Sequence, residues 1–101
     1  MRPIYLAQLD KVRPVVVLTR ETVRPYLSNV TVAPITSTVR GLSTEVAVGV
    51  ANGIDHASVI SCDNIQTVPV RCLGRRLGFL FDAQEPALTA AIHCAFDLDG
   101  P

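Results

Sequence analysis

The apolar residues of this chain fall mostly into short runs typical of β-strands. The strands that these runs predict cover residues 4–9, 13–19, 30–36, 44–50, 57–62, 65–70 and 75–81. The run 13–19 alternates little, which is typical of a strand covered on both faces. The run 44–50 instead places Val46, Val48 and Val50 on one apolar face. We therefore expect six or seven short strands.

One segment near the C-terminus has helical spacing, and it predicts a helix over residues 83–97. Asp82 is a suitable N-cap, and Glu85 three residues later completes a capping-box-like pattern. The apolar stripe of this helix consists of Leu88, Ala91, Ile92, Ala95 and Phe96. Residues 20–28 are polar and predict a loop or a single helical turn. The whole pattern predicts one domain, residues 1–101: a mainly β (α+β) fold in which a compact antiparallel β-barrel is capped by the helix.

Composition adds expectations about assembly and location. Of all residues, 49% are apolar and only 18% are charged, so a surface poor in charge is expected, as at a buried subunit interface. No run of about 18 apolar residues predicts a membrane span, and the N-terminal residues lack the apolar segment of a signal peptide. We therefore expect a cytoplasmic protein that makes no contact with membranes.

Charge is distributed unevenly, although its sum is zero. Residues 1–81 hold all nine basic residues, eight of them arginine, and five acidic ones, whereas residues 82–101 hold four acidic residues and no basic one. The planar fork of arginine suits bidentate contacts to phosphate. A solvated surface beside an acidic C-terminal segment explains the same asymmetry, so charge alone does not decide for nucleic acid.

Several chemistries find no support in the pattern. His56 and His93 do not stand at ligand spacing from Cys, Asp or Glu, so no metal site is predicted. His56 is expected to be exposed in a turn and paired locally, and His93 to pack or to face solvent. Cys62, Cys72 and Cys94 lack Cys-x-x-Cys spacing and are expected to be small, buried filler. A Cys–His nucleophile pair stays open, although nothing orients one.

The remaining candidate is Arg13, which stands before a proline at the opening of a strand. The residue before proline is biased to extended geometry, so this side chain projects in a defined direction. The next predicted strand closes with the hydroxyl cluster Thr36, Ser37 and Thr38. If the two strands pair, a guanidinium and hydroxyls meet at one sheet edge, where they can clamp a phosphate and orient a ribose 2′-OH.

Residue types alone favour a plainer alternative for this edge. In that alternative, Arg13 pairs with a neighbouring acid, and the hydroxyls satisfy backbone groups at the strand end.

Three motifs in a fixed order resemble those of the MazF/PemK/Kid family of toxin endoribonucleases. The motifs are RPVVVL (13–18), VTVAPITS (30–37) and VISCDNIQTV (59–68), the last leading to RRLGFL (75–80). The resemblance spans residues 2 to about 97. It implies an SH3-like barrel that forms a homodimer and cleaves single-stranded RNA without metal or cofactor. In that reaction the 2′-OH attacks the adjacent phosphate, leaving a 2′,3′-cyclic phosphate and a 5′-OH end.

The resemblance also implies the site residues and a partner. The catalytic arginine and threonine of the family fall on Arg13 and Thr36. The positions expected to bind RNA are Lys11, Ser37, Thr38, Arg40, Asp63, Asn64 and Gln66. A small acidic, partly disordered antitoxin of the MazE type is the expected inhibitor.

Two departures from the family pattern affect the expected substrate. The long loop between the first two strands is reduced here to Asp10-Lys11-Val12, which predicts a more open groove. Asn64 and Gln66 stand where glutamine and arginine are usual, which changes the hydrogen bonding available to base edges. The expected substrate is therefore mRNA or a folded loop of tRNA or rRNA, with the cleaved sequence left open.

Two alternatives from other classes remain at this point. The same barrel resembles CcdB-type toxins, which bind DNA gyrase and do no chemistry, although the C-terminal residues 97–101 lack the aromatic end of those proteins. A non-catalytic SH3-like module that binds RNA or protein is the other alternative.

Overall fold

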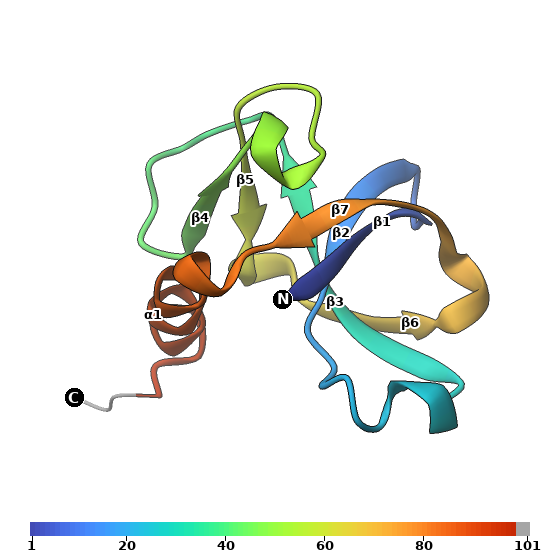
Figure 1. Ribbon diagram of the computed structural model, residues 1–101. Helices are drawn as coiled ribbons and strands as arrows, with labels where there is room; N and C mark the ends of the chain where they lie inside the picture. The colour runs from blue at the N-terminus through green and yellow to red at the C-terminus, as the bar shows by residue number, and fades with distance from the viewer. Residues whose placement is uncertain (99–101) are drawn as a thin grey trace.

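The chain folds into one curled antiparallel sheet packed against a C-terminal helix (Figure 1), and the computed structural model describes residues 1–98. The strands are β1 (Arg2–Gln8), β2 (Val12–Val17), β3 (Asn29–Thr36), β4 (Glu45–Val48), β5 (Ser58–Ser61), β6 (Gln66–Pro69) and β7 (Leu73–Leu80). The helix is α1 (Glu85–Phe96). This arrangement confirms the predicted mainly β class, and each predicted strand end lies within two residues of the observed one.

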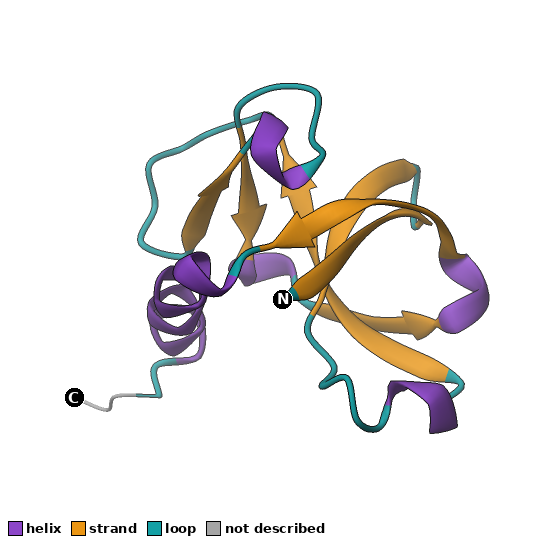
Figure 2. Cartoon of the chain, viewed as in Figure 1, coloured by secondary structure: helices purple, strands orange, loops and turns teal. Residues whose placement is uncertain are grey.

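Short 3₁₀ turns lie between successive elements (Figure 2), and they cover Arg24–Tyr26, Val50–Asn52, Cys62–Asn64, Val70–Cys72 and Asp82–Gln84, the last of which leads from β7 into α1. The first of them is the single turn expected within residues 20–28. No helix in the described part of the chain is long and apolar enough to cross a membrane.

Strand β3 holds the two parts of the sheet together. Hydrogen bonds link the strands in the order β4-β5-β3-β2-β1-β7, and β6 also pairs with β3. The residues Asn29–Val32 of β3 pair with β6, whereas Ile35 and Thr36 pair with β5. Because one strand serves both partners, the sheet curls into a half-barrel with the β4–β5 hairpin on one side and β6 on the other (Figure 1).

The central strands carry an apolar cluster on each face. Val16 of β2 belongs to the cluster that α1 covers through Leu88 and Ala91, whereas Val15 and Val17 belong to a second cluster with β6. The three valines are at most 1% exposed. Burial on both faces explains why the run 13–19 shows no alternation of apolar and polar residues.

The predicted cap of the helix is wrong. The Asp82 carboxylate lies 3.0 Å from the N-terminal amine, and the Glu85 carboxylate lies 2.9 Å from Nε of Arg2. The side chain of Gln84 instead accepts a hydrogen bond from the backbone N–H of Phe81 at 2.9 Å. The two acids pair with the cations of Met1 and Arg2, so they tie the start of the helix to the N-terminal end of the chain rather than cap it.

Three further expectations about burial are corrected. Val50 is exposed because β4 ends at Val48, and Phe96 is exposed at the end of α1. Cys62 is buried in the core as expected and Cys72 is partly buried, but Cys94 is exposed on α1. These positions lie where an element ends or turns away from the sheet, which local periodicity does not reveal. Asp99, part of the acidic C-terminal segment, lies outside the described residues.

Candidate active site

Arg13 and Thr36 face each other across two neighbouring strands. Strands β2 and β3 pair antiparallel with Val17 opposite Val32 and Val15 opposite Pro34. The ladder ends there, and Arg13 and Thr36, each two residues beyond the last pair, line the same two grooves. The cation and the hydroxyl therefore meet at one edge of the sheet, held by strands that are buried on both faces.

The guanidinium of Arg13 has an unused donor in this position. Its Nε is buried and has no hydrogen-bond partner among the described residues. Its Nη2 lies 3.4 Å from the carboxylate of Asp10, and that carboxylate is 79% exposed. The pairing with a neighbouring acid that the plainer alternative expects is therefore present, although an exposed ion pair of this kind contributes only about 0–1 kcal/mol. The Nε of Arg24 is also unpartnered, but Arg24 lines neither groove described below.

The hydroxyl of Thr36 accepts a hydrogen bond from the backbone and keeps its own donor. Its Oγ1 accepts a hydrogen bond from the N–H of Thr38 at 3.1 Å. The expectation that these hydroxyls satisfy strand-end backbone groups is therefore correct for Thr36. A hydroxyl also carries one donor, and that O–H remains available to an oxygen atom of a bound phosphate or ribose.

Two grooves meet at Arg13 and Thr36. The larger one, which we call the amide groove, has a volume of about 580 Å³. It is lined by Leu9, Asp10, Arg13, Pro34, Thr36, Thr38, Arg40, Leu42, Glu45, Ser61, Asp63, Asn64 and Gln66. Its cations are outnumbered by its three carboxylates, and its remaining polar groups are amides and hydroxyls.

Hydrogen bonds fix two polar side chains of the amide groove, Asp63 and Asn64. The hydroxyl of Thr44 donates to Asp63 at 2.6 Å, and the amide of Asn64 donates to Ser61 Oγ at 2.8 Å. These bonds leave Asp63 Oδ1 and the amide oxygen of Asn64 to meet other donors. The groove therefore presents oriented acceptors suited to base edges.

The rim of the amide groove is organised by Glu45. Its carboxylate accepts hydrogen bonds from the backbone N–H groups of Arg40, Gly41 and Leu42, at distances between 2.8 and 3.3 Å. Three converging N–H groups make an anion-binding turn. The turn holds the loop before β4 in place and so positions Arg40 at the groove.

The smaller groove, which we call the basic groove, has a volume of about 370 Å³. It is lined by Leu6, Lys11, Val12, Arg13, Pro14, Ile35, Thr36, Ser37, Gly53, Ile54, Asp55, His56, Ser58, Arg75 and Leu77. Its wall at residues 53–56 is pressed against β7. A side chain at Gly53, where φ is 87°, would collide with the carbonyl oxygen of Leu77.

The structure brings every predicted site residue to one of these two grooves. Thr38, Arg40, Asp63, Asn64 and Gln66 line the amide groove, Lys11 and Ser37 line the basic groove, and Arg13 and Thr36 line both.

Several groove residues were not identified from the sequence. Asp10, Glu45 and Ser61 line the amide groove, and His56 and Arg75 line the basic groove. Arg75 opens the segment RRLGFL that follows the third motif, and this position was the one available signal. His56 is exposed as expected, but its imidazole has no hydrogen-bond partner among the described residues, so the expected local pairing is wrong.

Neither a cysteine nucleophile nor a metal cluster is found at the site. Burial, and to a lesser degree the Asp63 carboxylate, raise the pKa of the Cys62 thiol to about 11. This thiol therefore stays protonated near neutral pH, and neither groove is lined by a cysteine. Within residues 1–98, no group of three or more His, Cys, Asp or Glu side chains is arranged to hold a metal ion.

Comparison with known proteins gives a consistent family. Residues 3–96 match the model of the PemK-like, MazF-like toxins of type II toxin-antitoxin systems. The endoribonuclease MazF3 of Mycobacterium tuberculosis is 67% identical over 99 residues, which cover 98% of this chain and 96% of that protein.

Solved structures agree with this result. The Mycobacterium tuberculosis toxin MazF-mt6 has a TM-score of 0.94 at 66% identity, covering 95% of this chain and 97% of that one. A mycobacterial endoribonuclease in complex with its cognate antitoxin has a TM-score of 0.86 at 25% identity, covering 98% of this chain and 95% of that one. The chain belongs to the PemK-like, MazF-like family of toxins of type II toxin-antitoxin systems.

Proposed function

We propose that this protein cleaves single-stranded RNA without a metal ion, at the point where Arg13 and Thr36 meet. The endoribonuclease class follows from the family and from the 67% identity to endoribonuclease MazF3. The observation that carries the proposed site is the unpartnered, buried Nε of Arg13, a residue that lines both grooves together with Thr36. A buried N–H donor that lacks a partner is costly unless a bound group supplies the acceptor.

The proposed reaction is an internal transesterification of the RNA backbone. The ribose 2′ oxygen bonds to phosphorus while the bond from phosphorus to the 5′ oxygen breaks. The 2′-OH gives up its proton and the departing 5′ oxygen gains one, so the products are a 2′,3′-cyclic phosphate and a 5′-OH, with no water consumed.

Arg13 and Thr36 have separate roles in this scheme. The guanidinium donates hydrogen bonds to the equatorial oxygens of the pentacovalent phosphate, where negative charge develops. The Thr36 hydroxyl donates to a phosphate oxygen or holds the 2′ oxygen in line. Asp10 contacts Nη2, at 3.4 Å, and leaves Nε without a hydrogen-bond partner among the described residues.

The protein is further proposed to act in the cytoplasm as a homodimer that an acidic antitoxin neutralises. Exposed apolar side chains support a covered surface: Val12 lines the basic groove, Leu42 lines the amide groove, and Val39 lies on the adjoining loop. The related mycobacterial endoribonuclease was solved with its cognate antitoxin. The mRNA, tRNA or rRNA sequence that is cut is left to experiment.

The test is incubation of end-labelled RNA with purified protein in excess EDTA. We expect cleavage to persist and every new 5′ end to be a hydroxyl. A polynucleotide kinase detects such an end, because it labels a 5′-OH without prior phosphatase treatment. Loss of cleavage in EDTA would overturn the metal-free mechanism.

An Arg13→Ala variant tests the site itself. We expect cleavage to be lost while a matched Arg20→Ala variant, altered on an exposed loop away from both grooves, cuts at the normal rate. Full activity of Arg13→Ala would overturn the site. Reversible binding without any cut by the native protein would favour the non-catalytic alternative.

A further inference from the structure

An RNA strand that is cleaved at Arg13 and Thr36 must leave this point in two directions. The chain 5′ of the cleaved bond and the chain 3′ of it each need a path across the surface. The amide groove and the basic groove are two such paths, because both contain Arg13 and Thr36. This inference rests on the proposed function and adds a division of labour between the two flanks.

The two grooves differ in charge. Besides the shared Arg13, the basic groove has Lys11 and Arg75 against one carboxylate, Asp55. The amide groove has one further cation, Arg40, against three carboxylates. Cations contact phosphates without regard to sequence, whereas amides and carboxylates discriminate base edges.

The backbone of β7 turns Arg75 toward the basic groove. In the β1–β7 ladder, Tyr5 pairs with Arg76 and Ala7 pairs with Leu73, so two residues of β7 stand opposite the single residue Leu6. This extra residue is a β-bulge, a feature that re-aims a side chain next to a site. Arg75 lies in the bulge and lines the groove together with Leu6.

The neighbouring Arg76 is occupied elsewhere. Its guanidinium carbon lies 4.8 Å from the centre of the Phe79 ring, in a cation–π contact, and Arg76 does not line either groove. Arg75, by contrast, has no hydrogen bond or ion pair among the described residues. Two adjacent arginines on one strand therefore have different surroundings.

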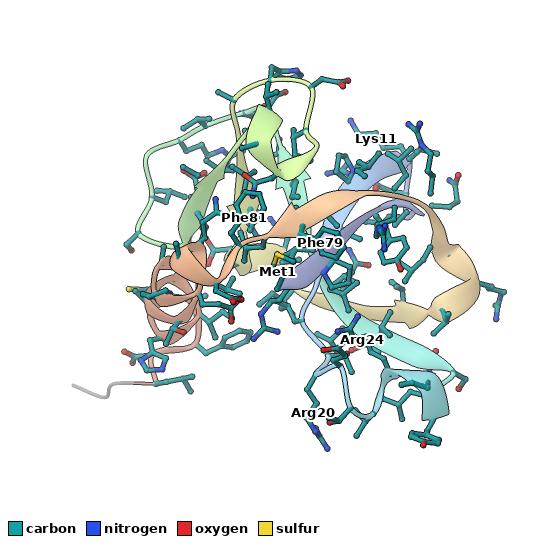
Figure 3. All side chains as sticks on the ribbon, in the orientation of Figure 1. Met1, Lys11, Arg20, Arg24, Phe79 and Phe81 are labelled. Atoms are coloured by element: carbon teal, nitrogen blue, oxygen red, sulfur yellow. The ribbon has the colours of Figure 1, made fainter. Side chains whose placement is uncertain are left out.

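Lys11 lines the same groove from a different element. It lies at the tip of the turn between β1 and β2, at the end of the molecule where the loop before β5 also lies (Figures 1 and 3). Its side chain is exposed and, within the described part of the chain, makes no ion pair. Lys11, Arg75 and Arg13 thus place three cations along one groove.

We propose that the basic groove binds the phosphate backbone of one RNA flank through Lys11 and Arg75 without reading its bases, while base recognition belongs to the amide groove. The sequence preference of the enzyme is then set on one side of the cleaved bond. The other flank contributes affinity that depends on salt and not on sequence.

The test measures binding separately from cleavage. The probe is a fluorescent single-stranded RNA of mixed sequence with 2′-O-methyl groups throughout, which has no 2′-OH to attack the phosphate. Its dissociation constant is measured over a range of salt concentrations. The logarithm of the association constant falls linearly with the logarithm of the salt concentration. Each lost phosphate contact on a single strand makes this fall shallower by about 0.7.

We expect Lys11→Gln and Arg75→Gln each to reduce the magnitude of that slope by about 0.7, and the double variant to reduce it by about 1.4. Arg75→Lys keeps the charge and is expected to keep the slope. Arg76→Gln is the matched control, since it removes the same charge one residue away and is expected to leave the slope unchanged. All variants alter exposed residues, and their thermal unfolding is compared with that of the native protein.

Cleavage mapping on total RNA completes the test. Lys11→Gln and Arg75→Gln are expected to cut the same sequences as the native protein, more slowly at physiological salt. An Arg75→Gln slope equal to that of the native protein, or a changed cleavage sequence in either variant, would overturn the inference. If the native protein cuts no RNA but the variants still show the expected slope changes, the proposed function would be overturned and this inference would stand.

Discussion

The two grooves that meet at Arg13 and Thr36 are built in different ways. Residues of the amide groove lie on segments fixed by hydrogen bonds, such as the turn Cys62–Asn64 with its bonds from Thr44 to Asp63 and from Asn64 to Ser61. The cations of the basic groove lie on a hairpin tip and on a β-bulge, with exposed side chains.

This difference determines which part of the RNA, base or phosphate, each groove can recognise. Hydrogen-bonded side chains present acceptors in one orientation, so a wrong base leaves a polar group unpaired, at a cost of about 1–3 kcal/mol. Exposed cations that make no ion pair attract any phosphate and impose little geometry. Rigidity therefore belongs with base reading, and charge with holding the strand.

The largest expected effect is at the shared point of the two grooves. Arg13→Lys keeps the charge but loses the planar fork and the buried Nε donor, so we expect kcat to fall by about 10²–10³-fold. Binding of the 2′-O-methyl RNA should change little. Single-turnover cleavage measures the rate, Arg20→Lys is the control, and a rate within a few-fold of the native protein would contradict the role given to Nε.

The next effect concerns the support of the amide groove. Leu88 of α1 is 1% exposed, and α1 packs on β4 and on the turn Cys62–Asn64. Leu88→Ala leaves a cavity there and is expected to lower the free energy of unfolding by about 2–5 kcal/mol.

Urea unfolding measures this loss, and Leu98→Ala, at an exposed position, should leave stability nearly unchanged. If the comparison holds, Leu88→Ala relaxes sequence preference and keeps the salt slope of binding. A reduced salt slope with unchanged preference would reverse the roles of the two grooves.

A smaller effect is expected within the amide groove. Asn64→Asp removes the amide that donates to Ser61 Oγ and adds a carboxylate. We expect the preference among bases at one position of the cleavage site to change by about 10-fold, the size of one base-edge contact. Competition cleavage of RNAs that differ in one base measures it, with Asn29→Asp as a control outside both grooves. An unchanged base preference would show that Asn64 does not contact the bases of the RNA.

The smallest effect concerns Cys62, which links the amide groove to the core. The thiol has an ordinary pKa of 9.0 and a pKa of about 11 in the folded protein, chiefly because it is buried. Above pH 9.0 the unfolded chain loses this proton more readily than the folded one, so stability is complete below 9.0 and declines as pH rises through about 11.

Urea unfolding across this pH range measures the decline. Cys62→Ala removes the thiol and should make the fall with pH shallower, whereas Cys94→Ala, at an exposed site, should not. Equal slopes in all three proteins would show that Cys62 is not buried in its protonated form.

Much of the fold was predictable because strand patterns are local. The run Val15–Val17 is apolar throughout because both faces are buried, and the bounds of the strands follow within two residues. The helix cap was not predictable. Asp82 and Glu85 have the right types and spacing, but the N-terminal amine and Arg2 reach them from the other end of the chain.

The sequence by itself determined the residue types of the site and the extended backbone before Pro14, since both depend on near neighbours. Only the tertiary structure decided that Arg13 and Thr36 line the same grooves, because their proximity depends on the pairing of β2 with β3. It also decided that Arg75 and Arg76 differ, because the bulge arises from the pairing of β7 with β1. Local sequence sets what a side chain can do, and long-range strand pairing sets which groups it meets.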